Sequence, residues 1–139
     1  MEKTMRVLID THIFLWFFIE PKRISKLVRE FLENSLQNEV YISHVTAWEI
    51  AIKYGAGKLK LPETPELFVP DRIRRAGFLQ LPIKMAHVLS VHGLPPIHKD
   101  PFDRLLVSQA KAENLTILTA DPNFPRYKIK TLDAINFSI

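Results

Sequence analysis

Four acidic side chains are the residues of this sequence whose types and spacing could do chemistry. They are Asp10, Glu49, Asp103 and Asp121. Asp10 and Asp121 follow short apolar runs, and Glu49 and Asp103 lie in the early turns of predicted helices next to such runs. Carboxylates brought together repel one another, which raises their pKa and costs stability unless a cation joins them. Hard oxygen ligands suit Mg²⁺ or Mn²⁺ better than zinc. Such ions activate water and neutralise a phosphodiester, so this set predicts metal-dependent hydrolysis without a covalent nucleophile.

The elements that must position these acids follow from the hydrophobic pattern. The short apolar runs predicted as strands are Arg6–Ile9, Val40–Ile42, Phe78–Leu81, Leu115–Leu118 and Ile129–Leu132. The predicted helical segments are a short helix or turn at Ile13–Phe18 and helices at Lys22–Leu36, 44–54, Pro65–Ala76, Lys84–Val91 and 101–113. Ser43 and Asp100 are the expected N-caps of the helices that follow them, and Gly55 and Gly77 are expected to end the helices that precede them. This alternation is typical of a parallel sheet covered on both faces. We therefore expect an α/β fold with a central parallel sheet of about four to five strands, in one domain of residues 1–139.

The topology of such a sheet bears directly on the acids. Ligands of doubly wound sheets lie beyond the carboxyl ends of the strands. Asp10 follows the first predicted strand directly, and Asp121 follows the fourth after two residues. If those two strands are neighbours, we expect all four acids to converge on one cleft.

Each acid also has a purely structural interpretation. Asp10 is suited to cap the helix that follows it. Glu49 has the i,i+4 spacing for a surface ion pair with Lys53, although Trp48 and Ile50 beside it favour the edge of a buried face.

The segment before the last helix has a similar ambiguity. Asp100 fits the N-cap position and Pro101 the first helical position, so capping explains Asp100 well. The helix dipole explains Asp103 in part. Asp121 before Pro122 is an ordinary start of a turn.

Composition excludes several other classes of protein. The 139 residues contain no cysteine, which rules out a disulfide framework, a thiolate zinc site and cysteine nucleophile chemistry. We find no apolar run of eighteen residues and no signal-peptide pattern at the start, so we expect a cytoplasmic protein without a membrane span. Lysine and arginine total 19 against 15 for aspartate and glutamate, a modest excess that permits a polyanionic partner.

Four segments, in this order, resemble the PIN-domain ribonucleases, with the greatest similarity to the VapC-type toxins of bacterial toxin–antitoxin pairs. The segments are Val7–His12, Ser43–Ile50, His98–Leu106 and Leu118–Phe124. Each motif alone is weak, whereas four in the right order and spacing are strong, and they span nearly the whole chain.

The resemblance implies a PIN-like α/β/α sandwich that hydrolyses RNA. It implies that Asp10, Glu49, Asp103 and Asp121 are the catalytic residues and hold one or two Mg²⁺ or Mn²⁺ ions, leaving a 5′-phosphate and a 3′-hydroxyl. It further implies a cognate antitoxin that neutralises the protein by occupying the cleft.

Other residues of these segments receive supporting roles. Thr119 matches the family's small hydroxyl residue near the metal, and Thr11 is expected to orient Asp10. Asp100 is interpreted as a cap more than as a ligand, and Arg104 as a candidate contact to an RNA phosphate. His98 is typical of this subgroup and receives no role.

The aromatic-rich run Phe14–Phe18 is too apolar for one face of an ordinary helix. We expect part of it in the core, and the remainder is open between core packing and a homodimer or antitoxin surface. Gly55-Ala56-Gly57-Lys58 lacks the spacing of a phosphate-binding loop, so it is interpreted as a helix end.

Three other functions make different demands on these residues. A receiver domain would need an acidic pair after strand one and an aspartate after strand three, where this chain has Asp10-Thr11 and Leu81-Pro82. An aspartyl phosphatase would need the pattern D-x-D, which Asp10-Thr11-His12 does not provide. A catalytically weak PIN domain that mainly binds RNA or protein remains the alternative.

Overall fold

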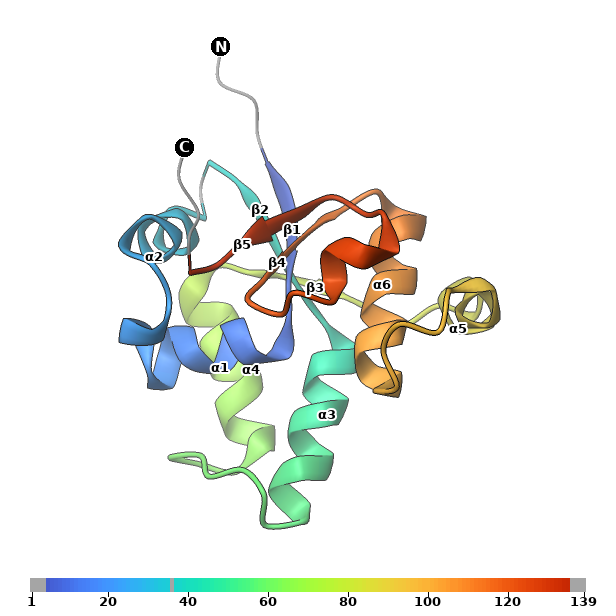
Figure 1. The fold of residues 1–139 in the computed structure, drawn as a ribbon. Coiled ribbons are helices and arrows are strands. Elements are labelled where there is room, and N and C mark those ends of the chain that lie inside the picture. Colours follow the sequence, from blue (N-terminus) through green and yellow to red (C-terminus); the bar gives the residue numbers. More distant parts are fainter. Residues whose placement is uncertain (1–4, 36, 136–139) are drawn as a thin grey trace.

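The five predicted strands all form, and they pair in a parallel sheet (Figure 1). The computed structural model describes residues 5–35 and 37–135 of the chain. The strands are β1 (Arg6–Ile9), β2 (Glu39–Ser43), β3 (Leu79–Leu81), β4 (Thr116–Thr119) and β5 (Thr131–Asp133). Their order across the sheet is β3-β2-β1-β4-β5, with every neighbouring pair parallel. The predicted α/β fold with a central parallel sheet is therefore confirmed.

The helices connect these strands and cover the sheet. They are α1 (Thr11–Ile19), α2 (Lys26–Glu33), α3 (His44–Gly55), α4 (Pro65–Ala76), α5 (Met85–Ser90) and α6 (Pro101–Glu113), with short 3₁₀ turns at Pro21–Arg23, Val91–Gly93 and Phe124–Tyr127. The predicted caps Ser43 and Asp100 both accept backbone N–H groups at the helix starts. Gly77 ends α4 in the left-handed conformation at φ 70°, as the pattern predicted.

The single helix predicted over Lys22–Leu36 is wrong. The chain forms a 3₁₀ turn at Pro21–Arg23 and then passes through extended backbone at Ile24, with φ −111° and ψ 156°. Ser25 stops the turn from continuing because its hydroxyl caps α2, accepting the Val28 N–H at 3.2 Å. The helix ends at Glu33, and Leu36 lies outside the described residues.

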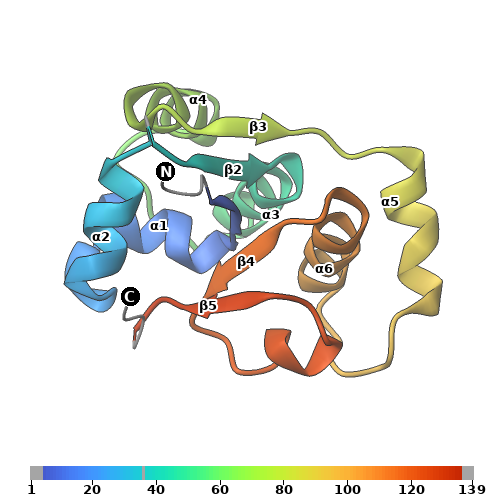
Figure 2. The same cartoon turned by 90° about the horizontal axis from the view of Figure 1, so that it is seen from above.

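Two apolar layers enclose the sheet, one on each face. Alternate residues of β1 divide between them, because Val7 and Ile9 point to one layer and Leu8 to the other. The first layer is filled by α1, α2 and α4, and the second by α6 and the 3₁₀ turn at Phe124–Tyr127. Figure 2 shows α1, α2 and α4 on one side of the sheet and α6 and α5 on the other. This is the expected α/β/α sandwich.

The sheet has a topological switch point between β1 and β4. The chain passes from β1 outward to β2 and β3, then returns to pair β4 against the other side of β1. The carboxyl ends of β1 and β4 therefore lie side by side, which is the condition that the sequence left open. Ligands of doubly wound sheets bind at this place. Over residues 5–35 and 37–135, no helix is long and apolar enough to cross a membrane.

Candidate metal centre

Asp10 uses its two carboxylate oxygens for different tasks. One oxygen caps α1 by accepting the Ile13 N–H at 2.9 Å, so the capping prediction is confirmed. The other accepts the hydroxyl proton of Thr119 at the end of β4. The Thr119 oxygen in turn accepts the Asp121 N–H at 2.9 Å. One hydroxyl thus joins the carboxyl ends of β1 and β4 and fixes both aspartates relative to each other.

Glu49 is buried, with 1% of its surface exposed. Its Oε2 accepts a hydrogen bond from Lys53 Nζ at 2.5 Å, one helical turn further along α3. The pair with Lys53 is present, and of the two positions that the sequence left open for Glu49, the structure shows the one on the buried face of α3. Glu49 Oε1 is buried and has no hydrogen-bond partner among the described residues. A buried carboxylate oxygen without a partner is costly, and a bound cation would satisfy it.

The start of α6 brings two further carboxylates to the same edge. Asp100 is the N-cap, since one of its oxygens accepts the N–H groups of Phe102 at 2.8 Å and Asp103 at 3.3 Å. Asp103 lies in the first helical turn and is partly buried. The structural role expected of Asp100 is therefore present, and Asp103 has a carboxylate that its own helix does not require.

Asp121 and His98 complete the cluster. Asp121 Oδ1 accepts the Asn123 N–H at 2.9 Å, which confirms the expected turn. Its other oxygen lies 3.0 Å from His98 Nε2. Ligand atoms from His98, Asp103 and Asp121 all lie within 4.8 Å of one another, a spacing that one metal ion could bridge.

His98 is the residue of this site to which the sequence assigned no role. Its backbone N–H donates to the Tyr127 hydroxyl at 2.7 Å, and its ring stacks on the Tyr127 ring at 6.3 Å between centroids. The ring of Phe124 packs against it edge-on. Nε2 is buried and, despite its short distance to Asp121, lies outside hydrogen-bonding geometry. The place of His98 in a segment that resembles the family was the only signal for it.

The electrostatics of the cluster match the expectation of mutual repulsion. Burial first, and then the negative charges of Asp100, Glu49, Asp10 and Asp121, raise the pKa of Asp103 to about 8. Burial also raises the pKa of Asp10, although hydrogen bonds from Thr119 and Ile13 oppose this. The four predicted acids therefore share one neighbourhood in which negative charge is unfavourable without a cation.

Lys53 supplies part of the compensating positive charge. Burial acts to lower its pKa, but the hydrogen bond with Glu49 and the charges of Glu49, Asp100 and Asp103 together raise it. The ammonium therefore stays protonated beside the carboxylates. One cation against this number of acids leaves the cluster with net negative charge.

The two remaining candidates make contacts with other parts of the chain. The Thr11 hydroxyl is 3.1 Å from the Thr46 hydroxyl, a contact between α1 and α3, so its expected role in orienting Asp10 stays a prediction. The Arg104 guanidinium donates to the carbonyls of Pro95, Val91 and Leu94, at 2.8 to 3.3 Å. Three of its donors thus hold the loop before α6, and a contact to an RNA phosphate stays a prediction.

The donor set fits a hard divalent cation. Its oxygen atoms come from carboxylates, and the chain has no cysteine that could supply a thiolate. The buried Glu49 Oε1 has no other partner among the described residues. His98 adds one nitrogen, which Mn²⁺ accepts more readily than Mg²⁺. The fold and the site together define a class of α/β protein with a parallel sheet and an acidic cluster at its switch point, the place where doubly wound sheets bind their ligands.

Comparisons with known proteins agree with this class. The family model described as PIN domain matches residues 7–130. Ribonuclease VapC16 from Mycobacterium tuberculosis (strain ATCC 25618 / H37Rv) is 46% identical over 52 residues, a stretch that spans 37% of this chain and 37% of that relative. Because the family model covers most of the chain, the chain belongs to the PIN domain family.

Solved structures share the fold. One chain of VapBC2 from Rickettsia felis, bound to a DNA fragment from their promoter, matches with a TM-score of 0.68 and 20% identity, over 93% of this chain and 98% of that chain. A chain of DNA-bound VapBC from Salmonella typhimurium matches with a TM-score of 0.66 and 20% identity, over 94% and 98%. At this level of identity the likeness concerns the fold, and it agrees with the sheet order and layers described above.

Proposed function

We propose that this protein is a metal-dependent endoribonuclease and the toxin of a toxin–antitoxin pair. The family membership and the partial identity to a VapC ribonuclease support the nuclease activity. The fold shared with VapBC complexes supports the toxin role. The proposed catalytic residues and metal ligands are the four acids Asp10, Glu49, Asp103 and Asp121, with Thr119 in a positioning role.

One observation carries the proposal: four carboxylates converge at the switch point, and one of them, Glu49, has a buried oxygen without a partner among the described residues. Mg²⁺ or Mn²⁺ bound there would neutralise the phosphodiester and supply activated water and a stabilised leaving oxygen. No side chain of the cluster needs to act as a covalent nucleophile.

The protein's own residues prepare the site for this chemistry. The Thr119 hydroxyl bonds to the Asp10 carboxylate and to the Asp121 backbone N–H, so the Asp10 side chain and the Asp121 main chain are held before any ligand arrives. Lys53 offsets part of the negative charge and lies where it could meet an RNA phosphate. His98 is fixed by Tyr127, which places its Nε2 beside Asp121. The arrangement is preorganised, which is the main protein contribution in a phosphodiester hydrolase.

The activity is tested with purified protein and an end-labelled single-stranded RNA. Wild-type protein should cleave the RNA internally in Mn²⁺ or Mg²⁺ and should be inactive in excess EDTA. Asp10→Asn should lose at least about 100-fold in cleavage rate, because a ligand charge is removed, while the Asn side-chain oxygen can still cap α1. Asp71→Asn is the matched control, because Asp71 pairs with arginines of α4 and does not belong to the cluster. Full activity in EDTA or in Asp10→Asn would contradict the proposal.

The toxin role requires a protein partner and, in our proposal, a second copy of the chain. Exposed apolar side chains on and before α5 offer surface for such contacts; they are Ile83, Met85, Val88 and Leu89. Part of the aromatic run of α1 is core, since Phe14 is fully buried, while Phe17 and Phe18 also line a groove with Leu32. Growth arrest on expression, relieved by co-expression of a small protein encoded directly upstream, would support the pairing. Arrest that persists in Asp10→Asn would argue against nuclease action as its cause.

A further inference from the structure

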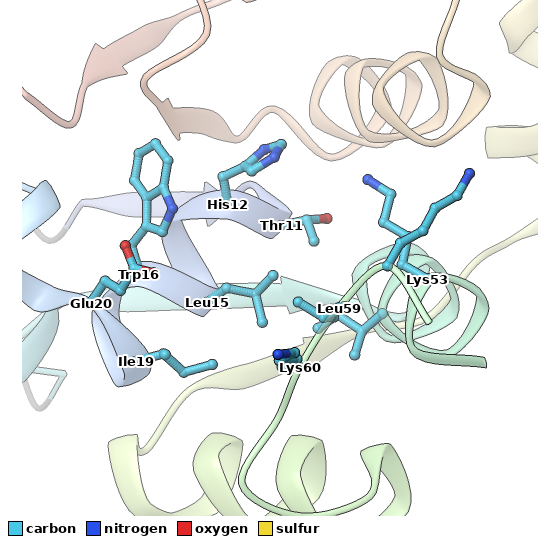
Figure 3. A pocket seen from close by; sticks show the side chains of 11 residues that line it. Thr11, His12, Leu15, Trp16, Ile19, Glu20, Lys53, Leu59 and Lys60 are labelled. Carbon is cyan, nitrogen blue, oxygen red and sulfur yellow. The ribbon is translucent and has the colours of Figure 1, made fainter. Parts of the chain in front are cut away.

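A pocket lies between α1 and the segment that follows α3, and two of its lining residues, Thr11 and Lys53, adjoin Asp10 and Glu49 of the acidic cluster. Its volume is about 370 Å³. Figure 3 shows His12, Leu15 and Trp16 projecting from α1 on one side, and Lys53, Leu59 and Lys60 on the other. None of the four acids lines this pocket, and Lys53 is the residue that the pocket shares with the acidic cluster.

The lining of the pocket has an apolar part and a cationic part. Leu15, Ile19, Ile50 and Leu59 contribute apolar side chains, and the ammonium groups come from Lys53, Lys58 and Lys60, here called the cationic rim. Lys53 is paired with Glu49, whereas Lys58 and Lys60 are exposed and have no ion pair among the residues that the structure describes. The acid of this lining, Glu20, is already engaged by Arg23 at 3.3 Å. The rim therefore favours an anionic ligand.

The α1 side of the pocket carries two rings. His12 and Trp16 lie 5.8 Å apart between ring centroids, tilted by 49°, and the Arg23 guanidinium covers the Trp16 ring at 4.2 Å. His12 is exposed and Trp16 is partly exposed. Aromatic rings next to cationic side chains are the combination that binds unpaired bases together with their phosphates.

The pocket adjoins the candidate metal centre through two of its lining residues. Thr11, which lines it, follows Asp10 directly, and Lys53, which also lines it, holds Glu49. A strand that places one phosphate at the acids and continues along α1 therefore enters this pocket with its neighbouring nucleotide. This adjacency, together with the exposed lysines, favours a nucleic-acid strand over an unrelated peptide.

We propose that this pocket binds a nucleotide of single-stranded RNA adjacent to the phosphodiester at the acidic cluster, with its base against His12 and Trp16 and its phosphate near Lys58 and Lys60. The inference rests on the proposed ribonuclease function and deepens it, because it assigns an RNA subsite beyond the acids. The pocket then contributes to which phosphodiester is cut.

Tryptophan fluorescence tests base stacking directly. The chain has two tryptophans, Trp16 and Trp48, so Trp48→Phe leaves Trp16 as the sole reporter and Trp16→Phe leaves Trp48. Single-stranded oligo(A) and oligo(U) of eight nucleotides are titrated in EDTA. We expect strong quenching in Trp48→Phe and much weaker quenching in Trp16→Phe. Equal quenching in both variants, or quenching of Trp48 alone, would overturn the inference, as would quenching of Trp16 by poly-L-glutamate but not by RNA.

Charge substitutions test the rim. Lys58→Gln/Lys60→Gln should weaken RNA binding by about 3- to 30-fold and reduce the slope of log affinity against log salt by about 1.4, the value expected for two lost phosphate contacts on a single strand. Lys111→Gln/Lys130→Gln removes the same charge from exposed positions outside the pocket and should leave the salt slope less affected. In Mn²⁺, the Lys58/Lys60 variant should raise KM with kcat nearly unchanged.

The two proposals fail in different ways. Wild-type protein that cleaves RNA, with the same KM in the Lys58/Lys60 variant and its control, would overturn the pocket inference alone. Wild-type protein that neither binds nor cleaves RNA under any metal condition would overturn the ribonuclease proposal and this inference with it.

Discussion

Asp103→Asn should make the metal-free protein more stable, although it removes a proposed catalytic group. Burial and four neighbouring carboxylates raise the pKa of Asp103 from 3.8 to about 8. The folded state therefore binds the proton more tightly than the unfolded state. The favourable contribution is fully present below pH 3.8 and is lost as the pH rises through about 8. Asparagine stays neutral throughout and carries no such penalty.

The magnitude follows from the pH interval. At about 1.4 kcal/mol per pH unit, the interval from 3.8 to 7.5 corresponds to a destabilisation of at most about 5 kcal/mol at pH 7.5. The side chain is 16% exposed, and water together with Lys53 reduces the effective cost, so we expect about 2 kcal/mol. For a domain of this size, the melting temperature should rise by about 8 °C.

The assay is a series of thermal melts in EDTA and in Mn²⁺ between pH 5 and pH 8.5. In EDTA, Asp103→Asn should melt above wild type at pH 7.5, with the difference shrinking toward pH 5. In Mn²⁺ the order should reverse, because binding to the folded state at 100 times Kd stabilises wild type by about 2.7 kcal/mol. The variant should respond much less.

Asp71→Asn is the control for this experiment. Hydrogen bonding and charge from Arg72, together with Arg75 and Arg74, lower the pKa of Asp71 against the opposing effect of burial. Its contribution to stability is present above pH 3.8 and is lost as the pH falls through its folded-state pKa. Its replacement should therefore lower the melting temperature and leave the response to Mn²⁺ intact. If Asp103→Asn melts at or below wild type in EDTA at pH 7.5, and Mn²⁺ stabilises both equally, the convergence of the acids is refuted.

Three further outcomes are expected. The apparent affinity for Mn²⁺ should rise by up to about tenfold per pH unit below pH 8 and level off above it, because Asp103 must lose its proton when the ion binds. Calorimetry in buffers of different ionisation enthalpy should detect the proton that is released. Thr119→Val should lower the free energy of unfolding in urea by about 1–2 kcal/mol and the cleavage rate by about tenfold, because the Thr119 hydroxyl positions Asp10 and Asp121. Thr116→Val is the control and should reduce both quantities by less. His87→Ala should lower the free energy of unfolding in urea by about 2–4 kcal/mol, because the buried His87 ring accepts the Lys84 N–H and bonds to Glu113. His92 is exposed, so His92→Ala should change that free energy by less than about 0.5 kcal/mol. Equal losses in the two variants would contradict the buried network.

The position of the acids along the chain was predictable because it depends on local patterns. Apolar runs predicted the strands, and the parallel topology they favour brings strand ends to one edge of a sheet. Asp10 and Asp121 follow the neighbouring strands β1 and β4, and they lie together as that argument required. The caps at Ser43, Asp100 and Gly77 are likewise local hydrogen-bonding preferences of single residues.

Contacts between elements distant in sequence could not be obtained in this way. Local spacing left Glu49 open between a surface pair with Lys53 and the edge of a buried face. Only the packing of α3 against its neighbours buries it and leaves Oε1 without a partner among the described residues. His98 is fixed by the rings of Phe124 and Tyr127, 26 and 29 positions further along the chain, and Thr11 bonds to Thr46.

The sequence by itself determined the strands to within a few residues, the caps and the identity of the acids, because each depends on residues within a few positions of one another. Tertiary structure alone decided the order of β1 and β4, the burial of Glu49, the place of His98 and the pocket beside α1. The physical reason is that burial and electrostatic repulsion depend on which side chains meet in space, and those meetings are set by the packing of whole elements.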